Sequence, residues 1–152
     1  MAFSRFGDVI DCHGVDHASI NQGYAERYGD MANVDTGSES GTVGVHVFVA
    51  NPRPMPIAIA LMERHPLGSQ MFIPMQDRRW LVLVCDDPLD ERSYFAFAAN
   101  GQQGINYKRN VWHHPLLVFD PASRFLVVDR KGKGNNLEEI CLKQPLQLLF
   151  PT

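Results

Sequence analysis

The sequence predicts an all-β protein, a barrel or a sandwich with one or two short helices. Seven short segments either alternate between apolar and polar residues or run apolar between turn signals, as strands do. The chain contains 10 prolines and 12 glycines, and these residues allow the tight turns that such a fold needs. At 152 residues the chain can bury most of its unfolded surface in one core, so a single domain over residues 1–152 is predicted.

The predicted elements follow one another with short loops between them. A weak helix is expected over 20–31, INQGYAERYGDM, ahead of the first strand. Strands are predicted over 42–50, 57–65, 70–75, 79–85, 94–99, 111–119 and 125–130. The first two of these alternate in hydrophobicity and the other five are mainly apolar, with Pro, Gly, Asn and Asp in the loops between them. A second short helix is expected near 136–142, NLEEICL.

Charge and cysteine content exclude several classes of partner. The net charge of −3 and the pI of about 6.0 give no electrostatic footprint for nucleic acid. No run of eighteen apolar residues and no signal-peptide core is present, which argues against a membrane partner. The three cysteines, Cys12, Cys85 and Cys141, are odd in number and lack CxxC spacing. Free thiols in a reducing compartment are therefore expected, and the predicted localisation is cytoplasmic.

A carboxylate and an imidazole follow the alternating segment 57–65. Ile57, Ile59 and Leu61 share one parity with Glu63 and His65. If the three apolar residues face the core, Glu63 and His65 emerge on the same face at the end of the strand, in the barrel mouth. The alternative is that both residues lie past the core and simply reach solvent.

The segment 106–115, NYKRNVWHHP, is unusually polar for a strand that leads into an apolar run. Adjacent strand residues point to opposite faces, so only one of His113 and His114 can share the interior with Glu63, and Trp112 would lie with His114. Buried polar groups are tolerated when they are hydrogen-bonded or coordinated. Two polar sets on two strands therefore favour a binding site over a purely structural core.

The spacing of these residues is similar to that of cupins, small β-barrels that hold a metal or ligand through two short motifs. The first motif runs His-x-His, three or four residues, then Glu; here Glu63-x-His65 is followed after four residues by Gln70. The second motif places a histidine five residues after a proline and three after a glycine. His113 falls on that histidine, with Lys108 and Asn110 at the other two places.

The residues around these positions resemble one particular family. MERHPLGSQMFIPM, GINYKRNVWHHPLL and FLVVDR, together with FGDVI and INQGYAERYGD, resemble ureidoglycolate lyase of allantoin degradation, formerly called ureidoglycolate hydrolase, in the same order over nearly the whole chain. The resemblance implies a cupin-like β-barrel, or double-stranded β-helix, that is usually a homodimer. It also implies a C–N lyase that cleaves (S)-ureidoglycolate to glyoxylate and urea. One departure is Lys108, where many members have histidine or arginine.

The implied reaction needs a base, an acid and a cation for the substrate carboxylate. Glu63, His65 and His113 can supply the base and the acid. The substrate-binding candidates are Gln70, Lys108, Arg109 and Arg27. Among the cations, arginine is preferred because its planar fork binds a carboxylate through two hydrogen bonds.

A divalent metal could also bind the substrate hydroxyl and lower its pKa. His65, Gln70 and His113 are the natural ligands, with Glu63 as a fourth, and nickel or manganese fits them better than zinc because no thiolate is present. The residues allow a metal-free reaction equally. Two further alternatives remain: an amidohydrolase that releases ammonia from the same substrate, and a non-catalytic cupin-like module that binds a small acid.

Overall fold

Strands dominate the computed structural model, which describes residues 3–149. In chain order the elements are β1 (Gly7–Ile10), β2 (Ala18–Ile20), η1 (Asn21–Gly23), β3 (Ala25–Arg27), η2 (Ser38–Ser40), β4 (Thr42–Ala50), β5 (Ile57–Arg64), β6 (Gln70–Pro74), β7 (Trp80–Cys85), η3 (Glu91–Ser93), β8 (Tyr94–Ala99), β9 (Gly104–Tyr107), β10 (Trp112–His113), β11 (Leu117–Val118), β12 (Ser123–Lys131) and β13 (Glu138–Leu148). The predicted all-β, cupin-like barrel is confirmed.

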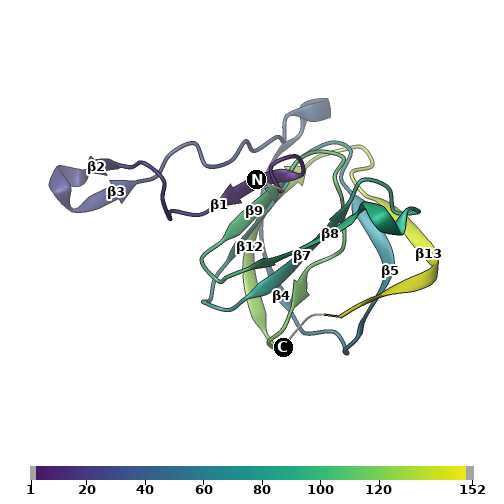
Figure 1. The fold of residues 1–152 in the computed structure, drawn as a ribbon. Helices are drawn as coiled ribbons and strands as arrows, with labels where there is room; N and C mark the ends of the chain where they lie inside the picture. Colours follow the sequence, from purple (N-terminus) through teal and green to yellow (C-terminus); the bar gives the residue numbers. More distant parts are fainter. Residues whose placement is uncertain (1–2, 150–152) are drawn as a thin grey trace.

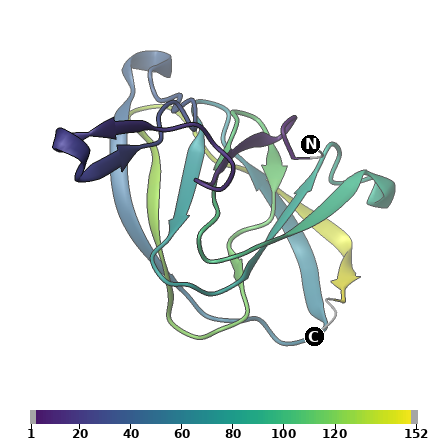
Figure 2. The same ribbon diagram turned by 60° about the vertical axis from the view of Figure 1, so that its left-hand side comes forward.

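Two antiparallel sheets form the barrel (Figures 1 and 2). One has the order β1-β9-β6-β12-β4, and the other has the order β11-β7-β10-β5-β13, with β8 paired to β7. The hairpin of β2 and β3 is a separate sheet that stands away from the barrel in Figure 1. Among the described residues no helix has the length and apolar character needed to cross a bilayer.

β7 is a continuous apolar run because both of its faces are buried. All six of its residues are buried. Trp80, Val82 and Val84 pack inside the barrel against residues of the opposite sheet, and the Trp80 ring meets Phe125 edge-on with centroids 5.0 Å apart. Leu81, Leu83 and Cys85, of the other parity, belong to a second buried cluster with residues of β5 and β11. Both faces of this strand are therefore covered.

Each of the seven predicted strands has a counterpart, but one of them is divided. Residues 111–119 form β10 and β11, which pair separately with β7 and flank Pro115, a residue without a backbone N–H to donate. The polar segment 106–115 is likewise not one strand. Tyr107 ends β9, and a turn through Asn110, whose φ is +66°, leads into β10.

Both helix predictions were wrong. Residues 20–31 contain the β2–β3 hairpin, where Asn21, Gln22 and Gly23 take positive φ values that an α-helix cannot contain. Residues 138–142 open β13, which pairs with β5 in a register that sets Ile140 opposite Met62. The described residues contain only three-residue 3₁₀ turns as helical elements. The single domain over residues 1–152 stays a prediction, and residues 1–2 and 150–152 of it lie outside the described residues.

Strand register positions the polar residues. β10 lies between β5 and β7, so that His113 is opposite Glu63 on one side and opposite Val84 on the other. In the other sheet, Gln70 opens β6 and is opposite both Tyr107 and Asp129. Ends of strands from both sheets thus carry polar side chains toward one region of the barrel.

Candidate active site

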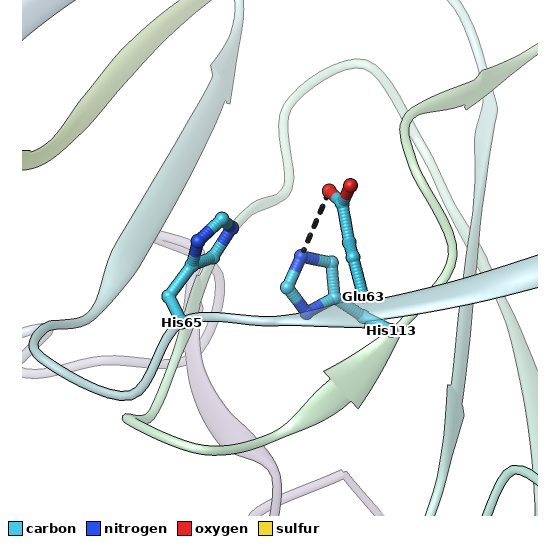
Figure 3. A group of neighbouring side chains, drawn as sticks. All are labelled: Glu63, His65 and His113. Atoms are coloured by element: carbon cyan, nitrogen blue, oxygen red, sulfur yellow. Dashed lines mark ion pairs between the residues drawn. The ribbon is translucent and has the colours of Figure 1, made fainter. Parts of the chain in front are cut away.

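Glu63, His65 and His113 form one cluster (Figure 3). One ligating atom from each residue lies within 4.8 Å of the others. Nε2 of His113 is 3.4 Å from Oε1 of Glu63, and the rings of His65 and His113 have centroids 5.2 Å apart. The structure therefore brings together the three residues that were predicted to supply the acid and the base.

The alternation that pointed to this cluster holds only in part. Ile57 and Ile59 are buried, but Leu61 is half-buried and its neighbour Met62 is completely buried instead. The reason is an irregularity in pairing: Cys141 and Leu146 of β13 face Leu61 and Ile59, so that the partner strand carries extra residues there. Ile57, Ile59 and Met62 all belong to the second buried cluster, whereas Glu63 lies opposite His113, whose other partner is Val84 of the first cluster. Glu63 therefore does not share a face with Ile57 and Ile59, as the parity argument required.

His113 is held rigidly with one nitrogen facing the cluster. Its side chain is 2% exposed, and its ring stacks on Tyr107 at a centroid distance of 4.2 Å and an interplanar angle of 15°. Nδ1 lies 2.9 Å from the carbonyl oxygen of Val111, which can only accept, so Nδ1 carries a hydrogen. Nε2 is buried and makes no hydrogen bond within the described residues. Such an atom is placed to bind a ligand.

His114 faces elsewhere, as strand parity predicted. Its Nδ1 lies 2.7 Å from the carbonyl oxygen of Pro115, and its backbone N–H donates to Leu83. Burial lowers the pKa of His114 to about 4, and its hydrogen bond at Pro115 opposes this shift only partly. His114 is thus a buried neutral imidazole at neutral pH.

At neutral pH His65 is a neutral imidazole, whereas Glu63 is an ionised carboxylate. Burial lowers the pKa of His65, and positive charge on His113 lowers it further. Nδ1 of His65 lies 2.7 Å from the carbonyl oxygen of Asn136, so the neutral ring keeps its hydrogen there. Burial acts to raise the pKa of Glu63, but its interactions with His113 and His65 outweigh burial, and the net shift is downward. Glu63 is therefore a carboxylate that can accept a proton.

Gln70 joins the cluster from the opposite sheet. Its side chain is buried, and Oε1 lies 3.1 Å from Nε2 of His65. Its Nε2 donates to Oδ2 of Asp129 at 3.4 Å. The predicted site residues Glu63, His65, Gln70 and His113 thus lie in one place, which is what the cupin-like spacing indicated.

Residues 1–149 match the model of the ureidoglycolate lyase family. The chain belongs to this family. The ureidoglycolate lyase 1 of Rhizobium meliloti (strain 1021) is 48% identical over 139 residues, which cover 91% of this chain and 82% of that protein. The ureidoglycolate lyase of Burkholderia mallei (strain NCTC 10229) is 44% identical over 148 residues, covering 97% and 87%.

A solved structure gives an independent view of the fold. A 3,4-ketoisomerase from Helicobacter canadensis aligns with a TM-score of 0.51 and covers 88% of this chain and 89% of its own. At 15% sequence identity this similarity concerns the fold alone. The chemistry of this ureidoglycolate lyase family member must be read from its own residues.

Two of the three candidate cations lie together in a neighbouring pocket. Lys108 and Arg109 line a cavity of about 220 Å³ with Asp8, Asn33, Asp35 and Ser69. The Arg109 fork is already occupied, since Nε and Nη2 donate to the two carboxylate oxygens of Asp35 at 2.9 and 2.8 Å. Nζ of Lys108 donates to the carbonyl oxygen of Ser4 at 2.7 Å. Neither cation is free in this structure of the family member.

Arg27 is not brought to the cluster within one chain. It lies on β3 of the projecting hairpin and lines a different pocket, with Asp16, His17 and Asp30. The prediction that Arg27 binds the substrate beside Glu63 therefore has no support from the fold of a single chain. A hairpin stands in place of the predicted helix, and no pattern in residues 20–31 predicts where it lies.

The cluster has the donor set of a divalent-metal site. Two imidazoles and one carboxylate converge, a combination that binds iron, nickel and manganese. Each imidazole has its Nδ1 hydrogen-bonded to a backbone carbonyl, at Asn136 for His65 and at Val111 for His113, which is the usual orientation of metal-binding histidines. The unpartnered Nε2 of His113 also fits a metal. Gln70, the other predicted ligand, lies beside this set, with Oε1 3.1 Å from Nε2 of His65.

Two residues of this site were not identified from the sequence. Tyr107 stacks on His113, and Asp129 binds Gln70 and lies 3.2 Å from His46. Asp129 does not pair with its neighbour Arg130, which donates to the carbonyl oxygens of Ser38, Glu39 and Lys133. The parity of 125–130 could have shown that two neighbours point to opposite faces.

Proposed function

We propose that this chain, an enzyme of the ureidoglycolate lyase family, cleaves (S)-ureidoglycolate to glyoxylate and urea with Glu63 as base and His113 as acid. The observation that carries the proposal is the contact of 3.4 Å between the Glu63 carboxylate and Nε2 of His113 in a buried cluster. The family match over residues 1–149 and relatives that carry the name ureidoglycolate lyase support the choice of substrate.

The chemistry balances without water. The reacting carbon of ureidoglycolate carries a hydroxyl group and a ureido nitrogen. Glu63 takes the hydroxyl proton, the C–O bond becomes the carbonyl of glyoxylate, and the C–N bond breaks. Protonated His113 gives a proton from Nε2 to the departing nitrogen, which completes urea. Glu63 can then return its proton to His113 over the same short contact, and both groups regain their starting states.

The ionisation of the two groups supports these roles. Interaction with His113 contributes to a Glu63 pKa below its ordinary value, so Glu63 is ionised and can accept the hydroxyl proton. His65, with its lowered pKa, is neutral and serves as an acceptor beside Gln70. The proposed acid, His113, and the proposed base, Glu63, are thus separate residues, and the base is ionised as its role requires.

Lys108 and Arg109 are the groups proposed to bind the substrate carboxylate. The backbone N–H of Asn110 donates to the carbonyl oxygen of His65 at 3.0 Å, so the loop with both cations is attached to the cluster. Asp35 occupies the Arg109 fork in the ligand-free chain and must exchange with the substrate carboxylate for bidentate binding.

If a divalent metal is part of the enzyme, Glu63, His65 and His113 are its proposed ligands, with Gln70 nearby. Nickel or manganese is the proposed ion, because imidazole and carboxylate donors suit both. When bound, such an ion acidifies a hydroxyl group that it contacts. The hydrogen bonds at Asn136 and Val111 orient the two imidazoles in either case.

A homodimer in the cytoplasm is the proposed state of the enzyme. β4 is the end strand of its sheet, and Val43, Val45, Val47 and Val49 on it are 48–64% exposed. An exposed apolar edge strand of nine residues favours pairing with another chain. The three free cysteines suit a reducing compartment.

Product analysis tests the proposal directly. Purified protein with (S)-ureidoglycolate is expected to release urea and glyoxylate in equal amounts, faster than a control without enzyme, because ureidoglycolate also decays unaided. Ammonia in place of urea would identify an amidohydrolase. Tight binding of the substrate without turnover would instead identify a non-catalytic module.

A further inference from the structure

A chain of polar side chains links the outer edge of the five-stranded sheet to His65. Nε2 of His46 lies 3.2 Å from Oδ1 of Asp129, and the other oxygen of Asp129 accepts from Gln70 Nε2 at 3.4 Å. Oε1 of Gln70 then lies 3.1 Å from Nε2 of His65. His46, Asp129 and Gln70 are on the adjacent strands β4, β12 and β6. The contacts thus cross the sheet from an exposed edge to the site.

Gly44 makes room for this chain of contacts. It lies directly opposite Asp129 in the pairing of β4 with β12 and is buried on an otherwise exposed strand. A Cβ atom at this position would lie 2.7 Å from Nε2 of His46 and 3.2 Å from Oδ1 of Asp129. The absence of a side chain at Gly44 lets the His46 ring reach the carboxylate across the edge strand.

The carboxylate determines which way the Gln70 amide points. An ionised carboxylate only accepts hydrogen bonds, so the NH₂ group of Gln70 must face Asp129. The amide oxygen then faces His65. The reverse orientation would set the amide oxygen against the carboxylate and lose the hydrogen bond.

We propose that Asp129 is a positioning residue that fixes the Gln70 oxygen as an acceptor for the ureido N–H groups of the substrate. The carbonyl oxygen of Asn136 can only accept, so the ring hydrogen of His65 lies on Nδ1, and Nε2 and the Gln70 oxygen face each other as two acceptors 3.1 Å apart. Two adjacent acceptors suit a ligand with two donors, and a ureido group has several N–H bonds where a hydroxy acid has a single O–H donor. This role rests on the proposed function, but the orientation of Gln70 does not.

The orientation can be measured without activity. In ¹H–¹⁵N spectra of protein labelled at glutamine side chains, the Gln70 signals are those lost in Gln70→Ala. Asp129→Asn is expected to shift them, because an asparagine can present either its oxygen or its NH₂ group to Gln70. Asp86→Asn, which removes the carboxylate of an exposed ion pair with Arg5, is the matched control and should leave them in place. Unshifted Gln70 signals in Asp129→Asn would overturn the proposal.

Inhibition tests the ligand class. N-carbamoylglycine has the ureido and carboxylate groups of the substrate without its hydroxyl, and glycolate has no ureido group. Asp129→Asn should weaken inhibition by N-carbamoylglycine about tenfold, the lower end of losses seen when a residue that orients a site is changed. Inhibition by glycolate should not change. Equal weakening of both inhibitors would mean that Asp129 acts on the site as a whole, and would refute the specific role.

A double-mutant cycle tests whether Asp129 acts through Gln70. In the Gln70→Ala background, Asp129→Asn is expected to cause no further loss of kcat/KM, since the group that it positions is gone. Losses that add together would show an independent role and contradict the proposal. If wild-type protein does not cleave ureidoglycolate, the proposed function fails, while the spectra still decide whether Asp129 orients Gln70.

Discussion

The Glu63–His65–His113 cluster and the pocket of Lys108 and Arg109 are joined by the loop between β9 and β10, which carries both cations and leads to His113, but they are built differently. The cluster stands on paired strands, where register sets Glu63 opposite His113 and both imidazoles are hydrogen-bonded to backbone carbonyls. The cation pocket stands on turns, and the side chains of Arg109 and Asp35 are each 36% exposed. The first region can hold reacting atoms in fixed geometry, while the second can exchange one carboxylate for another.

The largest effect is expected in the rigid region. His113→Ala should lower kcat by about 10²–10⁴, which corresponds to about 3–5 kcal/mol of transition-state stabilisation, because it removes the acid and leaves Glu63 without its partner. His114→Ala is the matched control: it removes an equally buried imidazole that faces away from the cluster. Steady-state kinetics on both variants, with circular dichroism to confirm folding, measure the difference. Near-normal kinetics in His113→Ala would assign the catalytic roles to Glu63 and His65 alone.

The contrast between the two regions also explains what the sequence could predict. The cupin-like spacing predicted that Glu63, His65, Gln70 and His113 share one site, and strand parity predicted that only one of His113 and His114 faces it. Alternation over 57–65 was not a sufficient guide, because Ile57 and Ile59 pack with Met62 in the other buried cluster. The failures concern long-range pairing. The occupation of Arg109 by Asp35 joins residues 74 positions apart through a loop with no periodic pattern.

The failed helices have the same physical origin. NLEEICL has residues that favour helix, but pairing of β13 with β5 overrides that preference. The hairpin containing Arg27 depends on positive φ values at Asn21 and Gln22, which residue identity alone did not reveal. Asp129 was missed because its partners, Gln70 and His46, lie on two other strands.

Rigid burial should also make the protein sensitive to acid. The folded-state pKa of His114 is about 4, below the ordinary value of 6.5. Between these values the unfolded chain binds a proton that the folded chain does not, so stability is lost as pH falls from about 6.5 to about 4. The shift corresponds to about 3 kcal/mol at 1.36 kcal/mol per pKa unit.

Urea denaturation of wild type and His114→Gln from pH 7 to pH 4 measures this contribution. The glutamine can still donate to the carbonyl oxygen of Pro115 but does not titrate. We expect the variant to lose less stability than wild type over this range, whatever its stability at pH 7. If the unfolding free energies of both proteins fell in parallel with pH, His114 would be protonated in the folded protein as readily as in the unfolded chain.

The smallest effect is expected in the pocket of Lys108 and Arg109, as a change of KM. The direction of the KM change in an Asp35 variant distinguishes two roles for Asp35. Arg109→Lys keeps the charge but loses the planar fork, so KM should rise about five- to tenfold, roughly 1 kcal/mol, with little change in kcat. Asp35→Asn should lower KM if Asp35 merely occupies the fork until the substrate carboxylate replaces it. It should raise KM if Asp35 orients Arg109 for the substrate. Ser69 binds the backbone N–H and carbonyl oxygen of Asp35, so this substitution leaves the loop attached. An unchanged KM in both variants would mean that Lys108 binds the substrate carboxylate and that the Asp35–Arg109 pair is only a structural contact.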